Sequence, residues 1–428
     1  MSEIIEHFKK IASLPHCSYK AEKLKEHIIV YAKACGFDVQ VDAYENILAS
    51  KGTPRICLQA HYDMVCIGHT EAMELVFEGD ILSAKDATLG ADNGMGMAII
   101  FTCMQKFANL EVLFTSNEEV GLIGASQLQL QLQSSYLLNL DGEQEDEIYV
   151  GCAGGVDIVA SREFTCKSLP KESLFFEISV DGFIGGHSGV DIDKDIPSAI
   201  KVLVAELLQH KNMELISLEG GQMRNSIPKS AKAIIATGQD FSLMDARVRK
   251  CQIADPKQEA LKDGAVVLLA LNAIHQGVRV FDKEFQIPSI SANIGKIRQD
   301  GTKIIIDVNV RAMSDDDLLQ ASFECMSLFR LAGFSVEQEQ MHAAWKPQIG
   351  TFTKLVQEQM QKTYDGIALR AIHAGLECGV LIQTQQKKIE AVSIGPTIRF
   401  PHSTKEECDL ASVARIFQIV EQIIKKVG

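Results

Sequence analysis

Three predicted strands in the first third of the chain each end in ionisable residues, and helices are predicted between them. The strands are residues 55–65, 110–114 and 136–140. At or just after their carboxyl ends lie, in order, His61 and Asp63, Glu118 and Glu119, and Asp141. Alternation of strands and helices indicates a mainly parallel sheet, in which ligands bind at the carboxyl ends of the strands. Solvated loop charges would explain each cluster alone, but not why all occupy the same end of successive strands.

The pair formed by His61 and Asp63 is the first candidate for a metal site. Because the side chains of a strand alternate between its two faces, residues two apart lie on the same face. A carboxylate beside an imidazole is typical of a metal-ligating histidine, since the carboxylate orients the ring. A polar pair without a metal is the more common occurrence at the end of a strand, so this pair alone does not decide between the two readings.

The pattern changes after residues 151–155, where further strands alternate with helices up to about residue 345. The strand at 304–310 alternates apolar and polar residues, as expected in an antiparallel sheet with one solvated face. We therefore predict an α/β fold. Its first domain, residues 1–160 and 346–428, has a mainly parallel central sheet flanked by helices. An α+β domain with an antiparallel sheet, residues 161–345, is inserted into it.

The composition argues against several kinds of partner. A formal net charge of −14 disfavours nucleic acid and anionic membranes. The longest apolar run, which starts at Ala265, is shorter than the roughly 20 residues that span a bilayer. The 11 cysteines include no Cys-x-x-Cys pair, which indicates reduced thiols in a cytoplasmic protein. We therefore expect histidines and carboxylates to hold any metal.

Six motifs follow one another in the order found in a known family. They are His61-x-Asp63, Leu-Gly-Ala-Asp92-Asn93-Gly, Glu118-Glu119-x-Gly121, Leu-Asp141-x-Glu, Gly-Gly-His187-Ser-Gly and Pro-His402-Ser. Over nearly the whole chain, this set resembles the co-catalytic di-zinc exopeptidases of the carnosinase and aminoacyl-histidine dipeptidase type. The stretches Met223-Arg-Asn-Ser-Ile-Pro and His373-Ala-Gly-Leu-Glu-Cys-Gly are similar to those of the bacterial cytosolic Xaa-His (nonspecific) dipeptidases.

The resemblance implies five metal ligands and two zinc ions (Zn2+) per chain, with cobalt (Co2+) or manganese (Mn2+) as alternatives. His61 and Asp141 would bind one ion. Glu119 and His402 would bind the other, and Asp92 would bridge the two. The peptide bond after Asp92 is cis in such families. Imidazole nitrogen and carboxylate oxygen are suitable zinc donors, and a catalytic site keeps a position open for water.

Glu118 is the general base that the resemblance implies. It would take a proton from a water molecule held between the metals, which leaves a hydroxide, and would pass that proton to the leaving amine. Asp63 would support catalysis by orienting His61. Without the resemblance, Glu118 and Glu119 would be two solvated carboxylates in a loop.

The resemblance also implies contacts with the substrate, a small peptide. His187, in a glycine-rich turn of the inserted domain, would stabilise the oxyanion in its own site or in that of a partner subunit. Asn225 and Arg311 would hold the substrate carboxylate, and Glu377 would meet the free amino group. An arginine on a half-exposed strand is otherwise a surface residue. We expect the inserted domain to act as a lid and to form a homodimer.

The predicted function is hydrolysis of dipeptides, either Xaa-His or a broad range. Three departures from the family pattern leave the substrate preference open: Ala60 in place of Gly, Phe400 in place of a small residue, and a shortened loop at 66–88. A related di-zinc amidohydrolase (an acylamino-acid deacylase, carboxypeptidase or tripeptidase) is the first alternative. A catalytically inactive metal-binding protein is the second, and Glu118 argues against it because such a protein needs no base.

Overall fold

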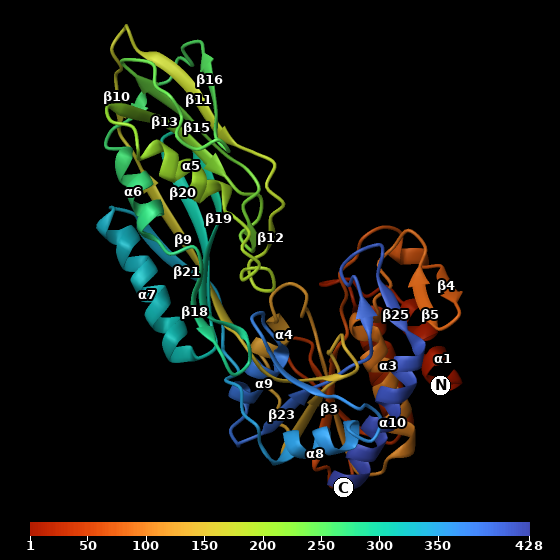
Figure 1. The fold of residues 1–428 in the computed structure, drawn as a ribbon. Helices are drawn as coiled ribbons and strands as arrows, with labels where there is room; N and C mark the ends of the chain where they lie inside the picture. Colours follow the sequence, from red (N-terminus) through yellow and green to blue (C-terminus); the bar gives the residue numbers. More distant parts are fainter. The chain divides into compact units, whose positions relative to one another are not determined.

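The computed structural model describes residues 1–428, apart from the side chain of Ala72, and divides into two compact units (Figure 1). Unit 1 consists of Met1–Cys152, Trp345–Ala371 and Gly375–Gly428. Unit 2 consists of Ala153–Ala344 and Ile372–Ala374, so most of it is one long insertion into unit 1. The two main divisions, at 152/153 and 344/345, lie eight residues and one residue before those predicted from the sequence, 160/161 and 345/346.

Unit 1 is built on an eight-stranded sheet in the order β1-β2-β6-β3-β7-β23-β8-β22. Its strands are β1 (Asp38–Val41), β2 (Ile47–Lys51), β3 (Ile56–His61), β6 (Leu110–Thr115), β7 (Tyr136–Asn139), β8 (Glu147–Cys152), β22 (Ala368–Ile372) and β23 (Glu390–Ser393). The central strands β6, β3, β7 and β23 run parallel, while β1 and β2 pair antiparallel at one edge. β2 also pairs antiparallel with β6, and β8 with β23, so the sheet is mixed, and the predicted mainly parallel arrangement is confirmed for its four central strands.

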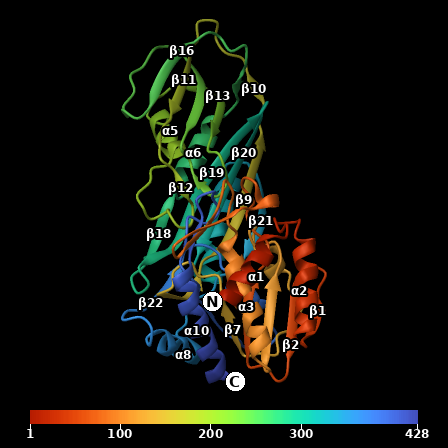
Figure 2. The ribbon, with the colours of Figure 1, turned by 90° about the vertical axis from the view of Figure 1, so that its right-hand side faces the viewer.

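Helices cover this sheet. They are α1 (Ser2–Ala12), α2 (Glu22–Ala34), α3 (Ala91–Lys106), α4 (Ile123–Ser126), α8 (Thr351–Met360), α9 (Glu377–Thr384) and α10 (Leu410–Val427), with a 3-10 turn at Thr70–Ala72. Helix α3 packs against β3 and β6, and α8 and α9 pack against β23. Figure 2 shows α1 beside α3. Every side chain of β3 and β6 is buried, as expected for strands covered on both faces.

A smaller sheet in unit 1 has the order β24-β25-β5-β4. Its strands are β4 (Leu75–Glu78), β5 (Ile81–Ala84), β24 (Ile398–Arg399) and β25 (Glu407–Asp409). The hairpin of β4 and β5 turns at Gly79. β25 pairs antiparallel with both β5 and β24. The loop between β24 and β25, which contains His402, is therefore held at both ends by strand pairing.

Unit 2 is built on an antiparallel sheet in the order β16-β11-β15-β13-β19-β20-β9-β21, with β18 paired to β19. Its strands are β9 (Gly154–Glu163), β11 (Leu174–Val180), β13 (Met213–Gly220), β15 (Ala231–Thr237), β16 (Arg249–Ile253), β18 (Gly277–Asp282), β19 (Ile287–Asp300), β20 (Lys303–Ala312) and β21 (Ser335–His342). Two short pairs join β10 (Cys166–Lys167) to β17 (Ala260–Leu261), and β12 (Gly186–His187) to β14 (Ser226–Ile227). The predicted antiparallel sheet is confirmed.

Three helices pack with the sheet of unit 2 and its hydrophobic core: α5 (Ala199–Leu207), α6 (Ala265–Ala273) and α7 (Asp315–Leu331). Helix α5 contacts β11 and β15, and α7 contacts β9 and β20. The start of α7 is well defined by the sequence. Ser314 caps it by accepting a hydrogen bond from the N–H of Asp317. The aspartates in its first turn interact favourably with the positive end of the helix dipole.

The prediction that the cysteines are reduced thiols is wrong for one pair. Cys17 and Cys66 form a disulfide, with their Cα atoms 5.5 Å apart, while the other described cysteines are free. The chain that follows β3 runs beside residues 16 and 17, and the N–H of Met64 donates to the carbonyl oxygen of His16 at 3.0 Å. This proximity depends on where β3 lies in the sheet. The spacing of cysteines along the chain does not show it.

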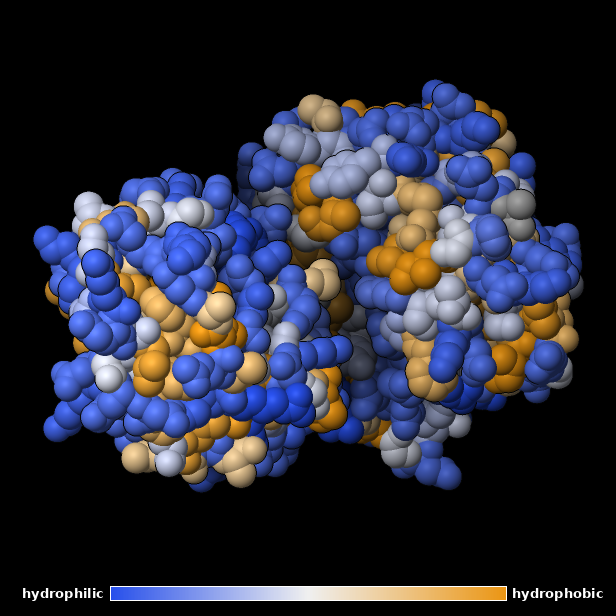
Figure 3. Space-filling view, turned by 90° about the horizontal axis from the view of Figure 1, so that it is seen from above, coloured by the Kyte–Doolittle hydropathy of each residue, from blue (hydrophilic) through white to orange (hydrophobic). Residues whose placement is uncertain are grey.

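The face of the molecule drawn in Figure 3 is mostly hydrophilic, with small, separate hydrophobic areas. Such a surface fits a chain with a formal net charge of −14. Within the part of the chain that the structure describes, no helix combines the length and the apolar character needed to cross a membrane.

We predict that the double substitution Cys17→Ser with Cys66→Ser lowers the free energy of unfolding by about 2–4 kcal/mol, because the cross-link restricts a long loop of the unfolded chain. The sequence separation of the two cysteines is 49. Denaturant unfolding followed by circular dichroism measures the change. Cys251→Ser, which alters an exposed free thiol, is the control and should leave stability unchanged. Equal unfolding midpoints for the double variant and the oxidised wild type would contradict the prediction.

Candidate metal centre

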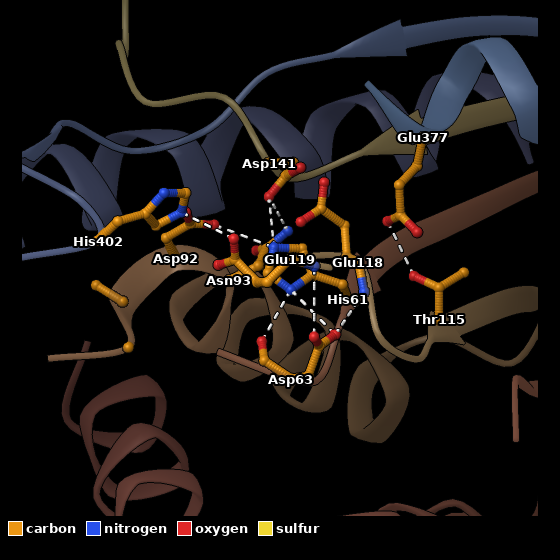
Figure 4. Close-up of polar contacts among 12 residues, drawn as sticks. His61, Asp63, Asp92, Asn93, Thr115, Glu118, Glu119, Asp141, Glu377 and His402 are labelled. Carbon is orange, nitrogen blue, oxygen red and sulfur yellow. Dashed lines mark hydrogen bonds and ion pairs between the residues drawn. The ribbon is translucent and has the colours of Figure 1, made fainter. Parts of the chain in front are cut away.

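Three neighbouring parallel strands bring ionisable side chains to one edge of the unit 1 sheet (Figure 4). β3 pairs with β6 on one side and with β7 on the other. The residues at or just beyond their carboxyl ends are His61 for β3, Glu118 and Glu119 for β6, and Asp141 for β7. Because the carboxyl ends of parallel strands meet at the same edge, residues distant in sequence converge here.

Asp92 and His402 reach the same place from other elements. Asp92 lies in the first turn of α3, and its peptide bond to Asn93 is cis, as predicted from the family resemblance. His402 lies in the loop between β24 and β25 and has a φ of +57°. This left-handed conformation is uncommon for a residue with a side chain, and such residues cluster at functional sites.

Asp92 lies between the two histidines, as Figure 4 shows. Its Oδ1 is 3.1 Å from Nε2 of His61, and its Oδ2 is 3.0 Å from Nε2 of His402. The Nε2 of His61 is also 3.2 Å from Oδ1 of Asp141. The Nε2 of His402 is also 2.9 Å from Oε2 of Glu119. One carboxylate thus joins two separate histidine–carboxylate pairs.

These side chains could hold metal ions. Three groups have ligand atoms that all lie within 4.8 Å of one another: His61 with Asp92 and Asp141, Asp92 with Glu119 and His402, and His61 with Glu118 and Glu119. The donors are imidazole nitrogens and carboxylate oxygens, which zinc accepts. Among the described residues, Oε1 of Glu119 is buried without a hydrogen-bond partner. The residues therefore fit a site for divalent cations.

The carboxylates of this cluster favour the protonated, positively charged form of both histidines. Hydrogen bonds to Asp92 and Glu119 raise the pKa of His402 to about 11. Burial by itself would lower the pKa of His61, but the neighbouring carboxylates, Asp141 first among them, raise it well above its ordinary value. Burial would likewise raise the pKa of Asp92, yet the hydrogen bonds from His402 and His61 hold it below its ordinary range. Divalent cations would supply the same compensation.

The remaining carboxylates are crowded and partly buried. Burial raises the pKa values of Glu118, Glu119 and Asp141, and their mutual repulsion adds to the effect for Glu118. Burial also raises the pKa of Glu143 to about 8, with repulsion from Asp92 and Asp141 as further causes. So many carboxylates in one buried place are costly unless cations or protons accompany them.

Asp63 lies beside His61 but orients it differently from the sequence-based expectation. The Nδ1 of His61 is 2.9 Å from the carbonyl oxygen of Asp63, and 3.8 Å from its carboxylate Oδ1. The predicted strand at 55–65 ends at His61, so Asp63 is not on a strand and the two-residue period does not apply to it. The carboxylate instead accepts hydrogen bonds from the N–H of Glu118 at 2.9 Å and from the hydroxyl of Ser18 at 2.7 Å.

Glu377 is fully buried in unit 1, at 0% exposure. Its Oε2 accepts hydrogen bonds from Nε2 of Gln59 at 2.5 Å and from the hydroxyl of Thr115 at 2.9 Å. Among the described residues, its Oε1 has no partner. Burial raises its pKa to about 7. The structure thus leaves one oxygen of Glu377 without a partner.

The other expected substrate contacts lie in unit 2. The Nε of Arg311 donates to Oδ1 of Asn309 at 2.9 Å, and the hydroxyl of Ser188 donates to the same oxygen at 3.3 Å. The N–H of Ser188 donates to the carbonyl oxygen of Asn225 at 2.9 Å. A chain of hydrogen bonds therefore connects Arg311, Asn225 and the turn that contains His187. Arg311 is 8% exposed, and so is not an ordinary surface arginine.

Sequence reasoning missed two histidines, His342 and His373, that lie close enough to Arg311 for its charge to act on them. Burial lowers the pKa of His342 to about 4 and that of His373 to about 3, and the charge of Arg311 lowers both further. The Nε2 of His373 is 2.7 Å from the hydroxyl of Ser291. The histidines lie 31 residues apart in sequence and share no motif, so only the fold reveals that they are neighbours of one arginine.

Comparisons with known proteins agree with this geometry. The sequence model of peptidase family M20/M25/M40 matches residues 57–426. The cytosol non-specific dipeptidase of Escherichia coli (strain K12) is 32% identical over 468 aligned positions, which cover 98% of this chain and 96% of that protein.

Solved structures also match nearly the full chain. The aminoacylhistidine dipeptidase from Vibrio alginolyticus has a TM-score of 0.87 at 28% identity, covering 100% of this chain and 97% of that one. A tripeptidase from Staphylococcus aureus has a TM-score of 0.66 at 16% identity, covering 100% and 98%. The second likeness shows a shared fold.

We predict that Asp92→Asn lowers the number of tightly bound zinc ions per chain by at least one, since the amide loses a charge and one oxygen donor. Elemental analysis after dialysis against zinc-free buffer measures the bound metal. Asp38→Asn, an equivalent change at an exposed position on β1, is the control and should retain the wild-type content. Unchanged zinc in the Asp92 variant would show that this carboxylate is not a ligand.

Proposed function

The chain belongs to peptidase family M20/M25/M40, and on this premise we propose that it is a metal-dependent peptidase that hydrolyses dipeptides, Xaa-His or a broader range. The observation that carries the proposal is the carboxylate of Asp92, which has one oxygen directed at His61 and the other at His402. A carboxylate in this position is suited to bridging two cations. Two relatives that match nearly the whole chain are named as dipeptidases.

We propose two zinc ions per chain. His61 and Asp141 would hold the first, Glu119 and His402 the second, and Asp92 would contact both. Cobalt and manganese would also accept these donors. When bound, the ions would supply Lewis acidity toward a water molecule and toward the carbonyl of the scissile peptide bond.

Glu118 would move the proton. Among the described residues, its carboxylate accepts no hydrogen bond, while its N–H is held by Oδ1 of Asp63 at 2.9 Å. The carboxylate would take a proton from water as the water oxygen attacks the carbonyl carbon. When the C–N bond breaks, the same proton would pass to the departing amine nitrogen. Asp63 would keep Glu118 in place for both transfers.

A dipeptidase must recognise both ends of its substrate. We propose that Arg311 and Asn225 bind the substrate carboxylate and that His187 stabilises the oxyanion, in its own chain or in a partner chain. The unpartnered Oε1 of Glu377 supports a contact with the substrate amino group. Glu143, a partly exposed carboxylate whose pKa is raised by burial and by Asp92, is a second candidate for this contact.

The substrate preference stays a prediction, and two positions bear on it. Ala60 is fully buried in β3, so its methyl group occupies space inside the sheet layer rather than at the surface. Phe400 is 60% exposed and lies two residues before His402. A side chain of this size beside a ligand would limit the substrates that fit.

We also propose that the protein forms a homodimer through unit 2. Helix α7 exposes Leu319, Phe323 and Leu331, the last at 86%. Exposed apolar side chains gathered on one helix are typical of an interaction surface. Light scattering of the purified protein would show the mass of a dimer.

The cytoplasmic location stays a prediction. The name of the Escherichia coli relative places that protein in the cytosol. The disulfide between Cys17 and Cys66 points the other way, since disulfides are rare in a reducing cytosol.

We predict that the zinc-loaded protein cleaves free dipeptides such as Xaa-His, β-Ala-His and Ala-Ala, but not their N-acetylated forms. Glu118→Gln should lower kcat by about 10²–10⁴-fold, because the amide cannot accept the proton of the water. Its bound zinc should stay at the wild-type level. Chromatographic measurement of product formation and elemental analysis of the protein test both statements.

Glu78→Gln, which alters an exposed carboxylate of unit 1, is the control and should keep wild-type activity. Turnover of the acetylated compounds alone would move the assignment to a deacylase. A lack of turnover with zinc, cobalt or manganese would leave a metal-binding protein without catalytic activity.

We predict that Arg311→Lys lowers kcat/KM for dipeptides by about 10–100-fold, mainly through KM. Lysine keeps the charge but lacks the planar fork that binds a carboxylate through two parallel hydrogen bonds. Steady-state kinetics measures both constants. Arg249→Lys, at an exposed position of the same sheet, is the control. An unchanged KM would exclude Arg311 from the binding of the substrate carboxylate.

A further inference from the structure

Glu406 is a buried carboxylate that none of the roles above uses. It is 2% exposed and lies four residues after His402, directly before β25. Its Oε2 accepts hydrogen bonds from the N–H of Leu89 at 2.9 Å and of Gly90 at 3.0 Å. Its Oε1 accepts from the N–H of Ala91 at 2.8 Å and of Asp92 at 3.2 Å. One side chain therefore binds four consecutive main-chain donors.

The segment that receives Glu406 is not fixed by its own helix. Gly90, the residue before α3, has no side chain to cap the helix. Asp92 and Asn93 have non-helical backbone angles within the first turn of α3, so regular helical hydrogen bonds do not set the direction of Asp92. The free N–H groups at this end carry partial positive charge, which an anion stabilises. Glu406 supplies that anion from more than 300 residues away in sequence.

The loop that contains Glu406 also contains His402. The hydroxyl of Ser403 donates to the carbonyl oxygen of Phe400 at 2.7 Å, and the N–H of Glu406 donates to the carbonyl oxygen of Ser403 at 3.2 Å. These bonds make residues 400–406 a compact turn. Where Glu406 binds the segment before α3, it also places the ring of His402 next to Asp92, at 3.0 Å.

We propose that Glu406 is a positioning residue for the second cation, the one held by Asp92, Glu119 and His402. Its carboxylate sets the separation between the chain that bears Asp92 and the turn that bears His402. The inference rests on the proposed two-metal function. The affinity of the second site would thus depend on a residue that does not touch the ion.

Zinc titration of the metal-stripped full-length protein, followed by calorimetry, tests the proposal without measuring activity. The wild type should bind two ions in two steps. Glu406→Gln places an NH₂ group against main-chain N–H donors, and should weaken one of the two steps by about 10–100-fold, as loss of a residue that orients a ligand does. The other step should stay within about threefold of wild type. Glu407→Gln, the same change at the next residue, is the control and should leave both steps unchanged.

A purely structural role for Glu406 gives a different result. In that case Glu406→Gln would lower the melting temperature while both zinc affinities stay equal to wild type or fall together, and either result would overturn the proposal. Glu406→Asp, which keeps the charge, should recover part of the lost affinity. If Glu406→Gln does not fold, Glu406→Asp serves as the test. Zinc affinities in this variant that equal those of the wild type in both steps would then overturn the proposal. A single binding step in the wild type would overturn the two-metal function itself, and this inference with it.

Discussion

The parallel pairing of β3 with β6 and β7 brings several carboxylates close together, and their mutual repulsion must be compensated by other groups of unit 1. These strands deliver His61, the adjacent glutamates and Asp141 to one edge of the sheet. Each of these carboxylates loses part of its hydration, which raises its pKa, and repulsion between neighbouring carboxylates raises the pKa further. Only positive charge at short range makes the arrangement favourable. The two histidines supply some of it, and divalent cations fit the same positions.

Buried carboxylates that accept main-chain hydrogen bonds appear twice around this centre. Asp63 accepts from the N–H groups of Glu118 and Glu119, and thereby fixes the turn after β6. Glu406 accepts from the segment that leads into α3 and contains Asp92. In both cases the acceptor is distant in sequence from the donors, so the bond locks two parts of the chain together. If the proposed ligands hold cations, they would need little rearrangement to meet an ion, which favours tight binding.

Much of this could be predicted from the sequence, and the errors have clear causes. Strand–helix alternation predicted the parallel sheet, because hydrophobic periodicity is a local property of the chain. The prediction that His61 and Asp63 leave the same face of a strand was wrong in its bounds, because β3 ends at His61. The expectation of reduced thiols failed for Cys17 and Cys66, since their proximity depends on the path of the chain after β3. Glu406 lies in a run of charged residues that local reasoning assigns to solvent.

By itself, the sequence determined which donor types are available, their order along the chain and the class of sheet that collects them. Those properties reside in residue identity and short-range periodicity. Tertiary structure alone decided which atoms meet: Asp92 between two histidines, Asp63 on the amides after β6, and Glu406 on the amides before α3. Each of these contacts joins segments that are far apart in the chain. Their distances depend on the packing of whole elements, and no local pattern of residues specifies that packing.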